Sequence, residues 1–227
     1  MKKKLYILTT VLFLQQTGFA QETFHRSTNN QFNSPGTENS TGNSGTGANI
    51  DVVYYRCDWT IDPSISKNIS GTVTTYFKTT VANVSVITFD FNNLVFGSPV
   101  AKYHGLTCTS SFPSTDIFRV TLPSSISTIG TLDSVSITYS GTPPSVSGQE
   151  EGFQRGELPA GSGNWYIYTL SESYEDRDWW PCKADMQDKI DSMDINVTVP
   201  WQGVDTFWVA SNGILVDSAI NGTERTF

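Results

Sequence analysis

The sequence predicts an all-β domain, with mainly antiparallel strands in a saddle-like or sandwich arrangement. Apolar and polar residues alternate with a period of two over most of the chain beyond residue 49. Turn-forming residues interrupt this alternation at intervals of roughly 8 to 12 residues, as in sandwiches and curved open sheets. No segment keeps a helical apolar period over three turns. Together these observations predict one domain built from strands.

The first 20 residues have the pattern of a secretory signal peptide. Three lysines, Lys2–Lys4, precede the apolar run Leu5–Leu14, and small residues lead to Ala20. A membrane-spanning helix needs about 20 apolar residues, and Gln15–Gln16 interrupts the run before that length. We therefore predict an exported chain, periplasmic, secreted or at the cell surface, without a transmembrane segment.

Residues 21–48 are rich in Asn, Ser, Thr and Gly and nearly lack aliphatic side chains. Such a segment cannot bury enough apolar surface to offset its chain entropy, so we predict a disordered leader. The β domain is predicted to cover residues 49–227.

The strands are predicted from alternation. In Ile69–Thr79, for example, Val73, Thr75 and Phe77 face one side and polar neighbours the other. The strand candidates are 50–61, 69–79, 84–91, 94–96, 102–110, 117–122, 134–140, 164–170, 194–199, 206–210 and 214–216, with a strand or hairpin at 218–227.

Turn-forming residues separate these candidates. The turn signals are Asp62-Pro63-Ser64, Asn92-Asn93, Pro113, Pro123-Ser124-Ser125, Gly130 and Asn212-Gly213. A long loop is predicted from Thr142 to Gly163, and the one short helix candidate is Met186–Asp191. Long loops in compact domains often have functional roles.

Composition excludes several classes of protein. The net charge is -8 and no patch of Lys and Arg is visible, so nucleic acid is not an expected partner. Three cysteines, Cys57, Cys108 and Cys182, are too few for a disulfide scaffold. One bridge in an oxidising compartment and three buried thiols both remain open.

The residues for metal or triad chemistry are missing. His25 lies in the leader and His104 in a predicted strand, without a partner that the sequence identifies. No H-E-x-x-H occurs, so no metal or cofactor site is expected in this chain. Cys182 follows Trp-Trp-Pro and is interpreted as a packing residue rather than a nucleophile.

One constellation, in the stretch from Asn164 to Ile190, has functional potential. It contains Glu172, Glu175 and the run Asp176–Asp178 with its central Arg177. A solvated acidic loop with one internal ion pair would explain it. Alternatively, one carboxylate accepts the ammonium group of a bound amine through a charge-assisted hydrogen bond.

The same stretch carries the motifs of a known family. They are Thr169-Leu170-Ser171-Glu172, then Glu175-Asp176-Arg177, Trp180-Pro181-Cys182, Asp185, Lys189 and Ala210-Ser211-Asn212-Gly213. In this order they resemble the amino-terminal domain of the aminopeptidase N family of zinc metallopeptidases, the gluzincins that include leukotriene hydrolase. The strands from Ile50 to Phe96 also look like that domain, so the resemblance covers residues 49–227.

The resemblance implies one functional residue. Glu172 matches the position that grips the free α-amino group of the substrate. The sequence differs from the family's pattern at two places. Leu170 replaces the family's Gln, and Lys183–Met186 replaces Phe-Asp-Glu-Pro, so Asp185 is not a like-for-like match.

The residues that hold zinc and break the peptide bond belong to the family's next domain and are not in this sequence. The resemblance thus implies the substrate-amine-binding domain of an exported zinc aminopeptidase, which removes amino-terminal residues from peptides. This chain is expected to be a truncated product, inactive alone, whose partner is its own zinc-containing catalytic domain. The alternative is a non-enzymatic cell-surface β-sandwich for binding or adhesion. A sugar-binding module with Trp179, Trp180 and Trp201 as platforms is a weaker third reading.

Overall fold

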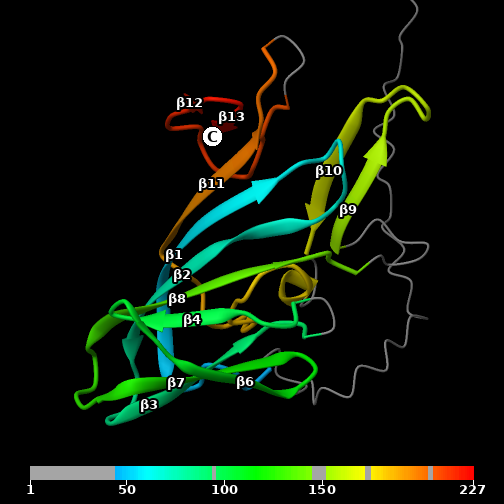
Figure 1. Ribbon diagram of the computed structural model, residues 1–227. Coiled ribbons are helices and arrows are strands. Elements are labelled where there is room, and N and C mark those ends of the chain that lie inside the picture. The colour runs from blue at the N-terminus through cyan, green and yellow to red at the C-terminus, as the bar shows by residue number, and fades with distance from the viewer. Residues whose placement is uncertain (1–43, 94–95, 145–151, 172–174, 204–206) are drawn as a thin grey trace, which may run out of the picture. The chain divides into compact units, whose positions relative to one another are not determined.

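The computed structural model describes residues 44–93, 96–144, 152–171, 175–203 and 207–227 (Figure 1). All of them belong to one compact unit, Gly36–Phe227. The other unit, Met1–Pro35, lies outside the described residues, and so does the predicted signal peptide. The elements are β1 (Ile50–Ile61), β2 (Ile69–Thr79), β3 (Val84–Asp90), β4 (Val100–Tyr103), β5 (Leu106–Thr107), β6 (Thr109–Ser114), β7 (Ile117–Ile126), β8 (Leu132–Gly141), β9 (Gly152–Glu157), β10 (Trp165–Leu170), a 3₁₀ helix η1 (Glu175–Asp178), β11 (Ser192–Pro200), β12 (Ala219–Asn221) and β13 (Glu224–Thr226).

The strands form three sheets. The largest has the order β12-β13-β11-β1-β2-β8-β4-β5, and the others are β3-β7-β6 and β10-β9. In Figure 1, β1, β2, β8 and β4 run side by side in the large sheet. All pairings between these strands are antiparallel except that of β1 with β11, which is parallel. The predicted all-β class with mainly antiparallel strands is therefore confirmed.

The β1–β2 pair has the bounds that the alternation predicts, and its register runs from Ile50 opposite Thr79 to Ile61 opposite Ile69. A bulge between Val52 and Tyr54 shifts this register by one residue. A bulge changes which residues face each side of a sheet. Val52 is consequently buried before the bulge, and Tyr55, with the alternate residues after it, is buried beyond it.

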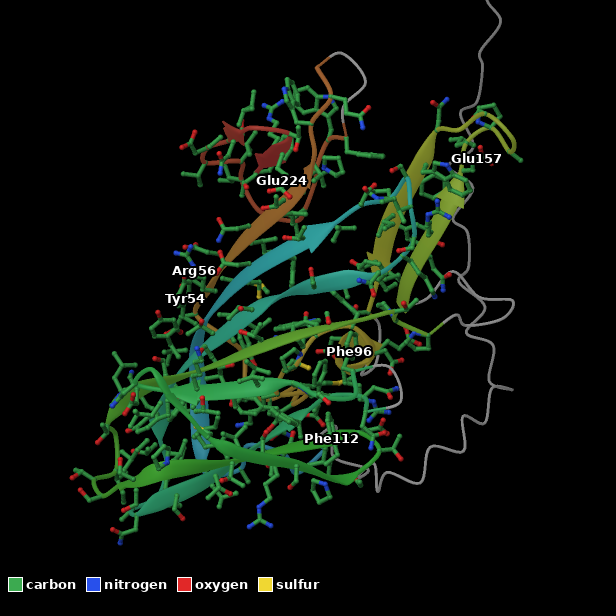
Figure 2. The ribbon with its side chains drawn as sticks, in the orientation of Figure 1. Tyr54, Arg56, Phe96, Phe112, Glu157 and Glu224 are labelled. Carbon is green, nitrogen blue, oxygen red and sulfur yellow. The ribbon has the colours of Figure 1, made fainter. Side chains whose placement is uncertain are left out.

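Aromatic side chains join the large sheet to the three-stranded sheet. The Phe91 ring, which follows β3, stacks on Phe96 with centroids 4.7 Å apart. It meets Tyr139 of β8 edge-on at 5.0 Å, and it also contacts Phe118 of β7. Figure 2 labels Phe96 and Phe112, and the Phe112 ring packs on Phe118 with centroids 4.9 Å apart. Both sheets thus share one apolar core, in which each buried Phe contributes about 1.5–3 kcal/mol.

The predicted strand 102–110 is wrong, because the chain turns within it. Strands β4 and β5 form a hairpin in which Tyr103 pairs with Leu106. The two loop residues, His104 and Gly105, have φ angles of 49° and 80°. Positive φ at both loop positions is the geometry of a type I′ turn, which matches the twist of the flanking strands.

Two prolines that were predicted to separate strands lie inside them. Pro113 is in β6, an edge strand, where the register is irregular between Ser111 and Ser114. Pro123 is in β7, at a second irregularity, where Val84 pairs with Ile126 but Val86 with Thr121. Proline lacks a backbone donor, so edges and bulges are the places in a sheet that tolerate it.

The predicted loop Thr142–Gly163 contains a strand, β9, paired with β10. Residues 145–151 of that loop lie outside the described residues. The carboxylate of Glu157, labelled in Figure 2, accepts hydrogen bonds from the amides of Gly161 and Gly163 in the turn that follows β9. The Arg155 guanidinium lies 3.5 Å from the Trp165 ring centroid and donates to the carbonyls of Pro63 and Ser64.

The outcomes of the remaining strand and helix predictions differ. Residues 207–210 and 214–216 form no strand, and residues 186–191 form turns and bends instead of a helix. Residues 94–95 and 206 lie outside the described residues, and Phe96 is not in a strand. The hairpin at 218–227 is confirmed by the pairing of β12 with β13. Within the described ranges, no helix has the length and hydropathy that a membrane crossing requires.

Candidate functional site

The predicted amine-binding residue, Glu172, lies outside the described residues, as do positions 173 and 174. The structure defines what stands on either side of it. β10 ends at Leu170, Ser171 follows, and the chain continues at Glu175 with the helix η1. The Ser171 hydroxyl accepts a hydrogen bond of 2.9 Å from the indole Nε1 of Trp179. The residue directly before Glu172 is thus tied to the Trp179–Cys182 segment.

Helix η1 is fixed to the loop that follows β3. The Asn92 amide donates to the Arg177 carbonyl at 3.0 Å, and the Asn92 side-chain Nδ2 donates to Asp178 Oδ1 at 2.9 Å. At its end, the Asp176 carbonyl accepts from the amides of Trp179 and Trp180. The carboxylate of Asp178 therefore has an internal structural partner, and the backbone of Asp176 closes the turn into the tryptophan pair.

The tryptophan pair belongs to the core. The side chains of Trp179 and Trp180 are each 9% exposed. The Trp59 ring contacts both, with centroids 4.8 Å from Trp179 and 6.1 Å from Trp180. The Tyr139 hydroxyl accepts from Trp59 Nε1 at 2.9 Å and donates to the Trp179 carbonyl at 3.0 Å. This burial contradicts the reading of Trp179 and Trp180 as sugar-stacking platforms.

Trp201, the third residue of that reading, is only partly buried, and Arg225 covers it. The guanidinium carbon lies 5.1 Å from the Trp201 centroid, 4.8 Å from Trp208 and 4.5 Å from Phe227. One of its nitrogens donates to Ser218 at 2.8 Å. These three aromatic rings therefore contact the guanidinium group of Arg225, which belongs to the chain itself.

Cys182 packs as the sequence predicts. Its backbone and that of Asp90 exchange two hydrogen bonds, of 2.8 and 3.1 Å, as an isolated antiparallel bridge. All three cysteines are buried free thiols, so the possibility of a disulfide is excluded. Burial raises the pKa of the Cys182 thiol well above its usual value, which disfavours the nucleophilic thiolate.

Lys183 anchors the next segment to β1. Its amide donates to the Tyr55 hydroxyl at 3.0 Å, and its Nζ donates to the Ile50 carbonyl at 2.7 Å and forms an ion pair with Asp188. The side chains of Lys183 and Asp188 are only 8% and 13% exposed. Lys183 is the first residue of the segment that replaces the family's Phe-Asp-Glu-Pro.

Burial sets the electrostatics of the segment. It raises the pKa of the Asp90, Asp176 and Asp178 carboxyls above the usual value for aspartate. Hydrogen bonds to each carboxylate act in the opposite direction, for example from Asn92 to Asp178. Asp90 is buried, whereas Asp176 and Asp178 are partly exposed. The contacts of these three groups stabilise the loop geometry, so the described residues act as the scaffold of the candidate site.

His104 has a partner that the sequence did not identify. Its Nε2 lies 2.8 Å from Asp133 Oδ1, and its ring stacks on Tyr103 with centroids 3.9 Å apart. The Tyr103 hydroxyl donates to the other oxygen of Asp133 at 2.7 Å. The described ranges hold no group of three or more His, Cys, Asp and Glu that could bind a metal ion. His104 therefore remains a structural residue of the β4–β5 turn.

Sequence reasoning missed Asp90, Asn92 and Lys183, which hold the segment. Asp90 is 1% exposed, although it occupies a position of β3 on the side opposite the large apolar residues. A carboxylate between Phe89 and Phe91 was the only available signal, because its partners lie far away in the sequence.

Comparison with known proteins identifies the fold. A scan against models of protein families finds no match, and a search of curated proteins finds none. Among solved structures, the M1 zinc metallopeptidase from Deinococcus radiodurans matches with a TM-score of 0.63 and 23% identity over 83% of this chain and 41% of that chain. Yeast LTA4 hydrolase in complex with bestatin matches with a TM-score of 0.58 and 13% identity over 86% of this chain and 28% of that one.

These proteins belong to the class that the motifs predicted, and the resemblance is confirmed at the level of the fold. The chain spans less than half the length of either protein.

Proposed function

We propose that this chain is the amino-terminal, substrate-amine-binding domain of an exported zinc aminopeptidase. The observation that supports this most strongly is the match of 83% of the chain to a 41% portion of an M1 zinc metallopeptidase. The motifs between Thr169 and Gly213 support it independently of the fold. The Deinococcus protein has also been crystallised with a Tyr-Ser-Ala substrate.

In this proposal Glu172 accepts the α-ammonium group of a peptide. It follows β10 and Ser171, whose hydroxyl is bonded to buried Trp179. A carboxylate–ammonium hydrogen bond contributes about 1.5–3 kcal/mol. A peptide whose amino group is acetylated would lack that bond.

Zinc is proposed to be held by a further domain of the same protein. When bound there, the metal would supply the activated water and polarise the carbonyl. A surface suited to such a domain is present, since several large apolar side chains are exposed in one segment. They are Trp208 at 72%, Ile214 at 91%, Leu215 at 63%, Val216 at 94% and Ile220 at 55%. Large exposed apolar side chains that lie close together in the sequence support the presence of an interaction site here.

The proposal is tested with the longest product of the gene and with the 227-residue chain. Each is assayed for release of the amino-terminal residue from an amino-acid p-nitroanilide, with and without a zinc chelator. We expect chelator-sensitive release by the longer product and none by the chain alone. No release by any longer product would favour the alternative, a non-enzymatic cell-surface module. Chelator-sensitive release by the chain alone would show that its assignment as a non-catalytic part is wrong.

A further inference from the structure

Residues 44–48, which the composition assigns to the leader, and Asn49 run along one side of β3. The Gly47 amide donates to Thr88 Oγ1 at 3.0 Å, and Asn49 Nδ2 donates to the Val86 carbonyl at 2.7 Å. A Cβ on Gly47 would lie 3.1 Å from Lys183 Cδ, so the segment also packs closely on Lys183. Residues 86, 88 and 90 alternate along β3, and each is contacted by this segment.

The carboxylate of Asp90 accepts two hydrogen bonds from this segment. Its Oδ2 accepts hydrogen bonds from Ser44 Oγ at 3.0 Å, from Thr46 Oγ1 and from the Ala184 amide at 2.7 Å. Two of these three donors come from the segment before β1, and the third comes from the loop after Cys182. A buried carboxylate is costly unless such donors satisfy it. Thr46 is 2% exposed, so this arrangement is closed to solvent.

We infer that Ser44, Thr46 and Asp90 form a latch that holds the Cys182–Ala184 segment against β3, and that removal of residues 44–46 loosens this segment. With the latch segment gone, Asp90 Oδ2 keeps only the Ala184 amide of its three donors. Water then enters where the segment lay and competes with the Ala184 amide for the carboxylate, so this hydrogen bond contributes less to holding the segment that follows Cys182. Trimming of the leader before residue 44 leaves the latch intact, whereas trimming beyond residue 46 removes it.

The latch requires no substrate and no metal, so its test is independent of enzymatic activity. Amide hydrogen exchange is measured by NMR in the full 227-residue chain, comparing wild type with the double variant Ser44→Ala, Thr46→Val. The reporters are the amides of Cys182 and Ala184, which donate to Asp90. The matched control is Thr80→Val, because the Thr80 hydroxyl donates to the Ala48 carbonyl of the same segment without involving Asp90.

We expect exchange at Cys182 and Ala184 to be roughly tenfold faster or more in the double variant, the effect of losing hydrogen bonds to a charged group. Exchange at Val73, in the centre of β2, should stay unchanged, and Ser44→Ala alone should give a smaller increase in the same direction. Equal exchange in the double variant and in Thr80→Val would overturn the inference. An equal acceleration at Val73 would also overturn it, since the segment would then stabilise the whole domain and not the loop.

Discussion

The Tyr139 hydroxyl offers the sharpest test of how the candidate site is supported. It bridges Trp59 of β1 and the backbone of Trp179, with hydrogen bonds of 2.9 and 3.0 Å, and the Tyr139 side chain is 5% exposed. Tyr139→Phe keeps the ring but removes both bonds. It leaves a buried indole N–H and a buried carbonyl without this partner.

Each group left unsatisfied costs about 1–3 kcal/mol. Because small shifts of the loop can recover part of this, we expect a loss of about 2–4 kcal/mol in the free energy of unfolding. The assay is urea unfolding followed by tryptophan fluorescence, with the free energy extrapolated to water.

The matched control is Tyr54→Phe. Its hydroxyl donates to Asp194 Oδ2 at 2.7 Å, at the surface. Surface changes of this kind usually stay within about 0.5 kcal/mol. A loss below about 0.5 kcal/mol for Tyr139→Phe, equal to the control, would refute the role assigned to this bridge.

Three further predictions address the same segment. Burial raises the folded-state pKa of Asp176, so its contribution to stability is present below the unfolded pKa near 3.9 and is lost as the pH rises through the raised pKa. Urea unfolding at several pH values should therefore show that Asp176→Asn loses less of its free energy of unfolding between acidic and neutral pH than wild type does. The same pH dependence in both proteins would contradict this. Breaking the buried Lys183–Asp188 pair by Lys183→Met should cost about 3–5 kcal/mol, against about 0–1 for the exposed Arg56–Asp58 pair in Arg56→Met. A thiol reagent at pH 8 should leave the folded chain unmodified and should label all three cysteines in urea, and rapid labelling of the folded chain would contradict their burial.

Alternation and turn residues were sufficient for the parts of the fold that depend on local pattern. The bounds of β1 and β2 follow from period-two sequences whose apolar residues are buried. β9, with the sequence Gly-Phe-Gln-Arg-Gly-Glu, escaped prediction because it has only one large apolar residue and takes its stability from pairing with β10. His104–Gly105 was missed because the expected hairpin signal is Asn-Gly or Asp-Gly, although histidine also tolerates a positive φ.

The candidate site was predictable only in part. Burial of Trp179, Trp180 and Cys182 followed from their composition. The role of Asp90 did not, because its hydrogen bonds join residues 44–46 and 184, which are 44 to 94 positions away. No local pattern encodes such contacts. Glu172 came from the family resemblance alone, and its assignment as the amine anchor stays a prediction.

The most direct test of the central proposal is the kcat/KM for an amino-acid p-nitroanilide, measured on the longest product of the gene with Glu172→Gln. Glu175→Gln, in the neighbouring helix η1, is the matched control. The loss of a carboxylate–ammonium hydrogen bond should lower kcat/KM roughly tenfold to hundredfold in Glu172→Gln and much less in the control. Equal values for wild type and Glu172→Gln would contradict the assignment of this chain as the amine-binding domain.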